Sequence, residues 1–163
     1  MKHILIIITC LALAGCYEEE EPCNTKYSHD DTVGETGLRL TATSEPFIPF
    51  SKMEALYNEI QSCLNLTAPA PLVEYHNFKE RGIGGGWGVF IVPSQTIWMN
   101  TDVGIAPRNC HSDRETLKHE YVHHLLYMNG GNYSHGSPEF ERCGALGVAT
   151  CNGVPCATGS WES

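Results

Sequence analysis

The sequence is poor in positive charge and contains no cluster of basic residues. Its 163 residues include 10 Lys and Arg against 19 Asp and Glu, which gives a formal net charge of −9. Proteins that bind nucleic acid neutralise phosphates with clustered Lys and Arg side chains. We therefore predict that nucleic acid is not a partner of this protein.

The sequence also lacks a membrane-spanning segment, an internal repeat and a phosphate-binding motif. The apolar run from Ile4 to Leu13 is too short to cross a bilayer. Residues 82–88 are rich in glycine, but neither Gly-Lys-Ser/Thr nor the G-x-G-x-x-G spacing occurs there. This glycine-rich stretch instead predicts a hairpin.

The N-terminal segment has the features of an export signal. Lys2 precedes the apolar run, and small residues follow it. Leu13-Ala14-Gly15-Cys16 resembles the bacterial lipobox, whose cysteine is lipid-modified and becomes the first residue of the mature chain. A plain secretory signal is the alternative. The resemblance implies a signal peptide over residues 1–15 and lipidation of Cys16. It further implies a membrane-anchored lipoprotein of the bacterial cell envelope, on its periplasmic or extracellular face.

The cysteine content agrees with an oxidising compartment. Of the eight cysteines, Cys10 lies in the signal and Cys16 would carry lipid. An even number remains, and disulfides are the default expectation for exported cysteines, although the sequence leaves their pairing open. A zinc knuckle formed by Cys143, Cys151 and Cys156 is an alternative with irregular spacing. The disulfide candidates are Cys23, Cys63, Cys110, Cys143, Cys151 and Cys156.

The mature chain divides into an acidic tether and one domain. Residues 16–45 are polar, begin with a run of glutamates and predict a lipid-anchored tether. Residues 46–163 predict a folded α+β domain. Its first helix is indicated by a capping-box pattern at Ser51 and Glu54 and by apolar residues at helical spacing. Those apolar residues are Met53, Leu56, Tyr57, Ile60 and Leu64.

A small sheet is predicted after this scaffold helix. Residues 72–78, 86–92 and 96–101 are rich in β-branched and aromatic residues, which favour strands. Trp87 and Trp98 flank the last two segments, so we expect them in the core or in a cleft wall. Disulfides would reinforce the modest core of a domain of this size.

A second long helix is predicted over residues 113–128. Ser112 and Glu115 form another capping-box pattern, and Asn129-Gly130-Gly131 supplies the stop. Apolar residues cover much of its circumference, so the helix should be largely buried. These residues are Leu117, Tyr121, Val122, Leu125 and Leu126.

This second helix contains the pattern H-E-x-x-H in the stretch HEYVHHLLY, residues 119–127. Residues four apart lie one above the other on a helix, so His119 and His123 can bind one ion. Buried imidazoles need hydrogen-bond partners, and zinc provides an alternative because it binds neutral imidazole. Glu120 lies beside the ion as the candidate general base. His124 lies on another face and is predicted to be a surface or supporting histidine.

A catalytic zinc site needs a third protein ligand, which must come from the segment after Gly131. His135 lies 12 residues beyond His123 in a Gly- and Ser-rich loop that can turn back toward the helix. Glu139 and Glu141 are alternative ligands. His135 is favoured over both, because glutamates at the start of a helix often only complement its dipole.

A short C-terminal helix is predicted to follow this loop. Ser137 and Pro138 have the residue types of a helix cap and first helical position. Phe140 and Leu146 are available to anchor the helix. His135 would then lie just before a fixed element, which suits a metal ligand.

The stretch HEYVHHLLYMNGGNYSHGSPEF, residues 119–140, resembles the zincin metallopeptidases. His135-Gly136 followed by Phe140 is similar to the third-ligand segment of the SprT-like group, and the resemblance covers residues 96–140. It implies a small zincin-like domain with a zinc cofactor. It also implies that the upstream strand, here QTIWMNTD, lines the substrate cleft. The implied ligands are His119, His123 and His135.

Other features depart from related patterns. SprT-like proteins are typically intracellular and several act near DNA, whereas this chain has an export signal and acidic charge, so a DNA-linked role is set aside. The residues after His123 supply neither the glycine nor the third histidine of the metzincins. A gluzincin arrangement needs a glutamate on the next helix, and Glu139 and Glu141 keep it open.

Two functions are consistent with these features. The first is an exported, lipid-anchored, zinc-dependent peptidase that hydrolyses a peptide or protein substrate with a metal-activated water. In that function Glu120 transfers the proton and Tyr133 is a candidate oxyanion donor. The second is a non-catalytic metal-binding surface lipoprotein with a structural zinc site, which a fourth protein ligand would favour.

Overall fold

The structure, a computed structural model, describes residues 26–27, 32–42, 45–83, 86–101, 110–146, 150–151 and 154–155. The predictions for Cys16, Cys23 and Cys156 lie outside these residues, as does most of the predicted tether. For Cys110 and Cys151 only the backbone is described. Within the described ranges, no helix has both the length and the apolar character needed to cross a membrane.

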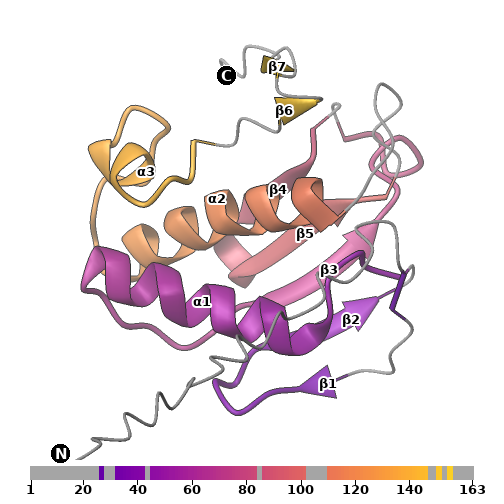
Figure 1. Ribbon diagram of the computed structural model, residues 1–163, viewed down its shortest axis with the longest axis horizontal. Coiled ribbons are helices and arrows are strands. Elements are labelled where there is room, and N and C mark those ends of the chain that lie inside the picture. Colours follow the sequence, from indigo (N-terminus) through magenta and orange to yellow (C-terminus); the bar gives the residue numbers. More distant parts are fainter. Residues whose placement is uncertain are drawn as a thin grey trace, which may run out of the picture.

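The fold is α+β, with two long helices packed over one face of a mixed sheet (Figure 1). The sheet has five strands in the order β1-β2-β3-β5-β4. β1 (Thr32–Val33) is antiparallel to β2 (Arg39–Ala42), and β2 is parallel to β3 (Leu72–His76). β3 is parallel to β5 (Thr96–Asn100), which pairs antiparallel with β4 (Gly88–Ile91). β4 is therefore an edge strand, although it precedes β5 in the chain.

The sheet starts earlier than the predicted domain boundary at residue 46. β1 and β2 lie inside the segment predicted as tether, and Leu38 and Leu40 are fully buried. The Glu54 carboxylate accepts hydrogen bonds from the Thr36 N–H at 3.0 Å and from its hydroxyl at 2.9 Å. These bonds hold the β1–β2 turn against the first helix. Two very short strands in a polar segment give too little alternation to be recognised.

The first predicted helix is confirmed as α1 (Phe50–Leu64), and all five predicted core positions on it are buried. The predicted capping box is wrong. The helix begins at Phe50, Pro49 occupies the cap position without a side-chain hydrogen bond, and Glu54 is bound to Thr36 instead. Asn65 ends the helix in the left-handed conformation, with φ of 54°.

The second predicted helix is confirmed as α2 (Cys110–Met128). Because it begins before Ser112, that residue lies within the helix and the predicted Ser112–Glu115 capping box is wrong. The predicted stop is confirmed: Gly130 has φ of +69°, and the Gly131 N–H donates to the Leu126 carbonyl at 2.8 Å.

The core lies between α1, α2 and the face of the sheet that they cover. The five apolar positions predicted on α2 are all buried there. The Tyr57 and Tyr121 rings meet edge to face with centroids 5.1 Å apart. Asp113, also buried, accepts hydrogen bonds from the Phe47 N–H at 2.9 Å and the Tyr75 hydroxyl at 3.1 Å. The first turn of α2 is thereby fixed to β3.

The predicted short C-terminal helix is confirmed as α3 (Pro138–Arg142). Phe140 is buried as predicted, but Leu146 is 54% exposed, so its predicted anchoring role is wrong and Ala145 is buried in its place. A disulfide joins Cys63 of α1 to Cys143, directly after α3. This bond confirms one of the predicted disulfides and contradicts the zinc knuckle. A two-stranded sheet, β6 (Thr150–Cys151) and β7 (Val154–Pro155), follows.

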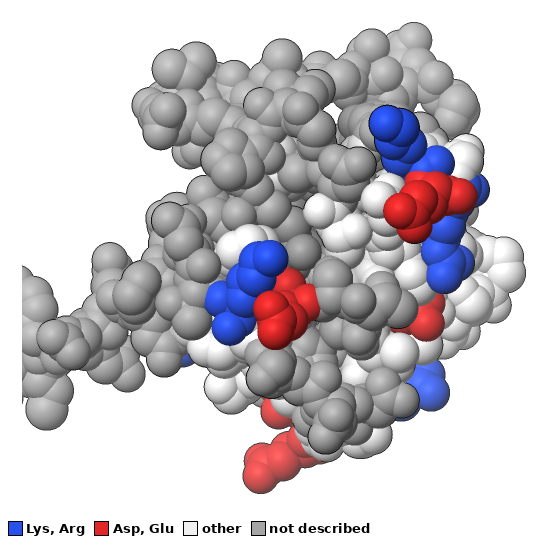
Figure 2. All heavy atoms as spheres, turned by 90° about the vertical axis from the view of Figure 1, so that its right-hand side faces the viewer, with Lys and Arg blue, Asp and Glu red and all other residues white. Residues whose placement is uncertain are grey.

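Charges of both signs are mixed on the face shown in Figure 2, where Lys and Arg lie beside Asp and Glu. In the described part of the chain, the Lys118 amino group and the Glu59 carboxylate approach within 3.6 Å. That nucleic acid is not a partner stays a prediction.

Candidate metal centre

Three imidazoles converge where the C-terminal half of α2 faces α3. His119 and His123 come from α2, and His135 comes from the loop that joins it to α3. The Nε2 atom of His123 lies 3.0 Å from that of His119 and 3.2 Å from that of His135. The Nε2 atoms of His119 and His135 are 3.0 Å apart. Among the described residues, this is the group of His, Cys, Asp and Glu that could hold a metal ion.

Two main-chain carbonyls determine which nitrogen of each helical histidine carries the proton. His119 Nδ1 lies 2.8 Å from the Ala145 carbonyl oxygen, and His123 Nδ1 lies 2.6 Å from that of Tyr133. A carbonyl oxygen can only accept, so both Nδ1 atoms must donate. In the neutral rings, each Nε2 then presents a lone pair to the centre.

Burial keeps these two imidazoles neutral. Desolvation is the largest cause that lowers the pKa of His119 to about 4; the Ala145 hydrogen bond opposes it and His135 adds to it. Desolvation, followed by the charge of His119, lowers the pKa of His123 to about 3. Neutral imidazole is the form that binds metal.

The Phe140 ring packs against the rings of all three histidines. Its ring centroid lies 4.8 Å from that of His119, 4.7 Å from that of His123 and 6.0 Å from that of His135. Phe140 is itself 1% exposed, so its position is fixed by the core. α3 therefore supports the three histidines through the Phe140 side chain, and Ala145 supports His119 through its carbonyl.

This donor set fits a tetrahedral metal ion. Two ligands at about 2.0–2.1 Å from a tetrahedral ion are about 3.3–3.4 Å apart, close to the observed Nε2 separations. Without a cation, at least two Nε2 lone pairs would face each other at 3.0 Å, which is repulsive. A cation removes this repulsion, and three imidazoles suit zinc among other transition metals.

Glu120 lies on the side of α2 that faces the edge strand β4. It is 5% exposed, and desolvation raises the pKa of its carboxyl to about 8, while a backbone hydrogen bond from Phe90 opposes that rise. Phe90 belongs to β4, whereas the sequence predicted that the segment 95–102 would line the site. In the described part of the sheet β5 lies between β3 and β4, so β4 and not β5 is the edge strand. That residues 95–102 line a substrate cleft stays a prediction.

His124 is a core residue and not the predicted surface histidine. It is 0% exposed, its Nε2 atom lies 2.9 Å from the Pro69 carbonyl oxygen, and its ring packs against those of Tyr57 and Phe90. Hydrogen bonding by Nε2 to a carbonyl makes Nδ1 the acceptor of the neutral ring. Of the two roles predicted for His124, the surface role is wrong because β4 covers this face of α2.

The other predicted site residues lie around the centre without joining it. The Tyr133 ring packs edge to face on Tyr127 at 5.4 Å, and the part of Tyr133 that contacts a histidine is its carbonyl. Its role as oxyanion donor stays a prediction. Glu139 accepts a hydrogen bond from the Ser137 hydroxyl, which lowers the pKa of its carboxyl, and Glu141 is exposed. Of the candidate third ligands, the structure brings His135 to the other two histidines.

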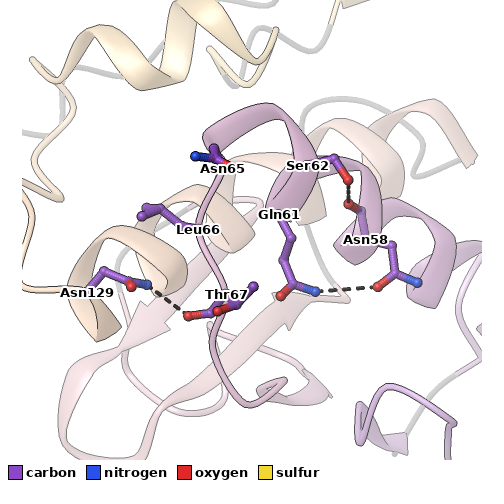
Figure 3. Close-up of a pocket in the computed structure, with 7 residues that line it drawn as sticks. All are labelled: Asn58, Gln61, Ser62, Asn65, Leu66, Thr67 and Asn129. Atoms are coloured by element: carbon purple, nitrogen blue, oxygen red, sulfur yellow. Dashed lines mark hydrogen bonds between the residues drawn. The ribbon is translucent and has the colours of Figure 1, made fainter.

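A separate hollow of about 600 Å³ lies away from this centre (Figure 3). Amide and hydroxyl side chains dominate its lining, and they bond partly to one another or to nearby carbonyls, as Gln61 does to Asn58 at 3.4 Å and Asn129 to Thr67 at 3.2 Å. None of the candidate site residues lines it. The lining consists of Asn58, Gln61, Ser62, Asn65, Leu66, Thr67 and Asn129.

Comparisons of the chain with protein-family models, with curated proteins and with solved structures find no match.

The metal-free protein should be most stable near pH 6.5. As pH falls below 6.5, the unfolded chain protonates both histidines while the native rings stay neutral, which lowers the free energy of unfolding. Glu120 acts oppositely, because between its unfolded pKa of 4.5 and its native pKa of about 8 the native state holds the extra proton. Burial also lowers the pKa of His124, so three histidines oppose the single raised carboxyl and stability should fall below pH 6.5 by at least about 1.4 kcal/mol per pH unit.

Denaturant titrations with a chelator present, from pH 5 to pH 8, would measure this dependence. In Glu120→Gln the opposing contribution is absent, so stability should fall more steeply below pH 6.5 and stay level between pH 6.5 and 8. A wild-type protein that gains stability steadily from pH 6.5 to pH 5 would contradict the neutral, buried state of the two rings.

The Cys63–Cys143 disulfide should support both the fold and the centre. Cys143 follows α3, which carries Phe140, and lies two residues before Ala145, whose carbonyl holds His119. Replacing both cysteines with serine should lower the free energy of unfolding by about 2–5 kcal/mol. It should also weaken zinc binding, by roughly 10-fold or more, as expected when the groups that orient ligands are loosened.

Chemical denaturation and competitive zinc titration would measure the two effects separately. An unchanged zinc affinity in the double serine variant would show that α3 holds the histidines without the covalent link to α1.

Proposed function

We propose that this protein is an exported, lipid-anchored, zinc-dependent peptidase with a zincin-like centre. The observation that carries the proposal is the convergence of three histidine Nε2 atoms within 3.0–3.2 Å of one another, next in sequence to a buried glutamate. The H-E-x-x-H spacing and the export features of the N-terminal sequence support it. Lipidation at Cys16 would hold the domain at the membrane of the cell envelope.

His119, His123 and His135 would hold the ion. A zinc ion with three protein ligands keeps a position open, where it polarises a carbonyl group and lowers the pKa of a bound water to about 7. The carbonyls of Ala145 and Tyr133 would keep the first two rings in the correct tautomer. Phe140 would exclude water from beneath the rings.

Glu120 would take the proton from the attacking water and pass it to the leaving amine. A carboxyl whose pKa lies near neutral pH can both accept and release a proton during turnover. Burial causes that raised pKa, and the Phe90 N–H keeps the ionised form accessible by donating to it.

The edge strand supports a peptide as the substrate. β4 has one paired side, toward β5, and one free side in the described part of the sheet. An extended peptide can add to such an edge through main-chain hydrogen bonds. Because Phe90 belongs to this strand, a peptide bound there would lie close to Glu120.

The alternative is a non-catalytic lipoprotein whose zinc site is structural. Such sites have four protein ligands, and in the described part of the chain no fourth His, Cys, Asp or Glu joins the three histidines. The open side of the centre, where His135 is exposed, favours the catalytic proposal.

Zinc content and hydrolysis measured together on the chain from Tyr17 onward would test the proposal. We expect one zinc per chain, cleavage of a fluorogenic peptide library, loss of cleavage with a chelator and recovery on adding zinc. One tightly held zinc with no cleavage of any peptide or denatured protein would favour the structural alternative. Absence of stoichiometric zinc would overturn both.

A further inference from the structure

Gly88, the first residue of β4, lies against α2. A Cβ atom at this position would lie 2.5 Å from the Thr116 methyl carbon and 3.2 Å from both Cγ and Oε1 of Glu120. Carbon atoms that are not bonded pack at about 3.5–4.0 Å, so a side chain here requires its neighbours to move. Gly88 is not among the glycines with positive φ, so the missing side chain and not the backbone conformation is what matters.

The chain just before Gly88 is held by the buried residue Asn100. Its N–H donates to the Trp87 carbonyl at 2.8 Å, and its side-chain amide donates to the Gly86 carbonyl at 2.6 Å. Asn100 is 2% exposed, and its side-chain oxygen accepts from the Phe78 N–H at 3.2 Å. β4 therefore cannot easily move to make room, and the side chains of Thr116 and Glu120 would have to yield.

Two residues further along β4, the main chain of Phe90 interacts with the Glu120 carboxyl and opposes the rise of its pKa. The same short strand thus meets the Glu120 side chain at two places: at Gly88, which has no side chain, and at the main chain of Phe90. The Glu120 side chain is 5% exposed, so it has little room to move away from β4.

We propose that Gly88 is a positioning residue for Glu120: its missing side chain lets the main chain of β4 pack directly against the Glu120 side chain and hold its carboxylate in place. The inference rests on the proposed function, because it concerns the general base of that reaction. It adds a residue that neither the H-E-x-x-H pattern nor the histidine cluster includes.

The two contacts of position 88 can be separated by substitution. Thr116→Ser removes the methyl carbon that lies 2.5 Å from the added Cβ, but it leaves Glu120 at 3.2 Å. Gly88→Ala combined with Thr116→Ser should therefore relieve the packing conflict and retain the displacement of Glu120. If Gly88 affects packing alone, the double variant should regain wild-type stability and activity. If Gly88 positions Glu120, the double variant should regain stability and keep the low activity.

The experiment uses the zinc-loaded full chain in detergent and three variants: Gly88→Ala, Thr116→Ser and the double variant. Thr116→Ser is the control, because it alters the neighbour of Gly88 on α2 and adds no atom at position 88. For each variant we would measure zinc content, melting temperature, kcat and KM, and the ¹H–¹⁵N shift of the Phe90 amide. Glu120→Gln supplies the reference shift for loss of the charged acceptor.

Gly88→Ala should keep its zinc, melt at lower temperature and lose roughly 10-fold in kcat, with KM changed less than about two-fold, since a small misplacement of a catalytic group acts on the chemical step. The double variant should regain the melting temperature but keep the low kcat. The Phe90 amide should shift toward its Glu120→Gln position in both variants, and stay in place in Thr116→Ser.

Wild-type kcat together with a wild-type Phe90 shift in the double variant would overturn the inference, because Gly88 would then affect packing alone. If Gly88→Ala does not fold, the double variant decides. If the wild-type protein binds zinc and hydrolyses nothing, the proposed function fails, and an unmoved Phe90 amide in Gly88→Ala would separately overturn the contact proposed here.

Discussion

Replacing Glu120 with glutamine should lower peptide hydrolysis by roughly 10²-fold or more while one zinc ion per chain stays bound. The amide has the same shape as the carboxylate and cannot take a proton from water. Because the side chain is 5% exposed, a neutral amide also avoids burying a charge, so the variant should fold. Metal analysis and kcat/KM on a cleaved peptide would measure the two properties on the same sample.

Glu115→Gln is the matched control, since Glu115 lies on the same helix and outside the histidine cluster. It should keep both zinc and activity. Unchanged hydrolysis in Glu120→Gln would remove Glu120 from the mechanism, and loss of zinc from that variant would make Glu120 a ligand instead of the base.

The buried faces of both long helices were predictable from the sequence, because helical periodicity is a local property. All ten apolar positions predicted on α1 and α2 are buried. The approach of His119 to His123 was equally local, since residues four apart on a helix are neighbours. The return of His135 to the helix is not a local property, because a loop of this length has many conformations. The Gly- and Ser-rich composition of the loop and the resemblance of His135-Gly136 to a third-ligand segment predicted it.

The starts of the two long helices could not be predicted, because a capping pattern competes with partners far away in the chain. Glu54 has the spacing of a capping residue to Ser51 but instead accepts two hydrogen bonds from Thr36, which is 18 residues away. Ser112 likewise lies inside α2 and not at its start. Local sequence patterns compete with tertiary contacts and, at these two helices, the tertiary contacts prevail.

Which strand forms the edge of the sheet also could not be predicted from the local sequence. Residues 86–92 and 96–101 have similar composition, and nothing in either segment shows which one pairs with β3. The parallel pairing of β3 with β5 places β4 at the edge and brings its main chain to Glu120. Main-chain groups such as the Phe90 N–H and the Ala145 carbonyl have no signature in the sequence, so this part of the site required the structure.

For the third ligand, we expect His135→Ala to lose most of its zinc affinity. Glu139→Ala and Glu141→Ala should retain stoichiometric metal. The His135 Nε2 atom lies 3.0 Å and 3.2 Å from those of the other two histidines.

Loss of a residue that merely orients a ligand costs about 10- to 100-fold in metal affinity, so loss of a ligand should cost more than about 100-fold. His135 is exposed, so its removal should change the free energy of unfolding of the metal-free protein by less than about 0.5 kcal/mol. That small change separates loss of a ligand from loss of the fold.

The two glutamate variants are the controls. The Glu139 carboxylate accepts a hydrogen bond from the Ser137 hydroxyl, and Glu141 is exposed at the start of α3, so truncating either side chain should leave zinc binding unchanged. Competitive zinc titrations with each purified variant, together with denaturant unfolding in chelator, would measure both quantities. Retained zinc in His135→Ala and lost zinc in Glu139→Ala or Glu141→Ala would instead place a glutamate at the third position.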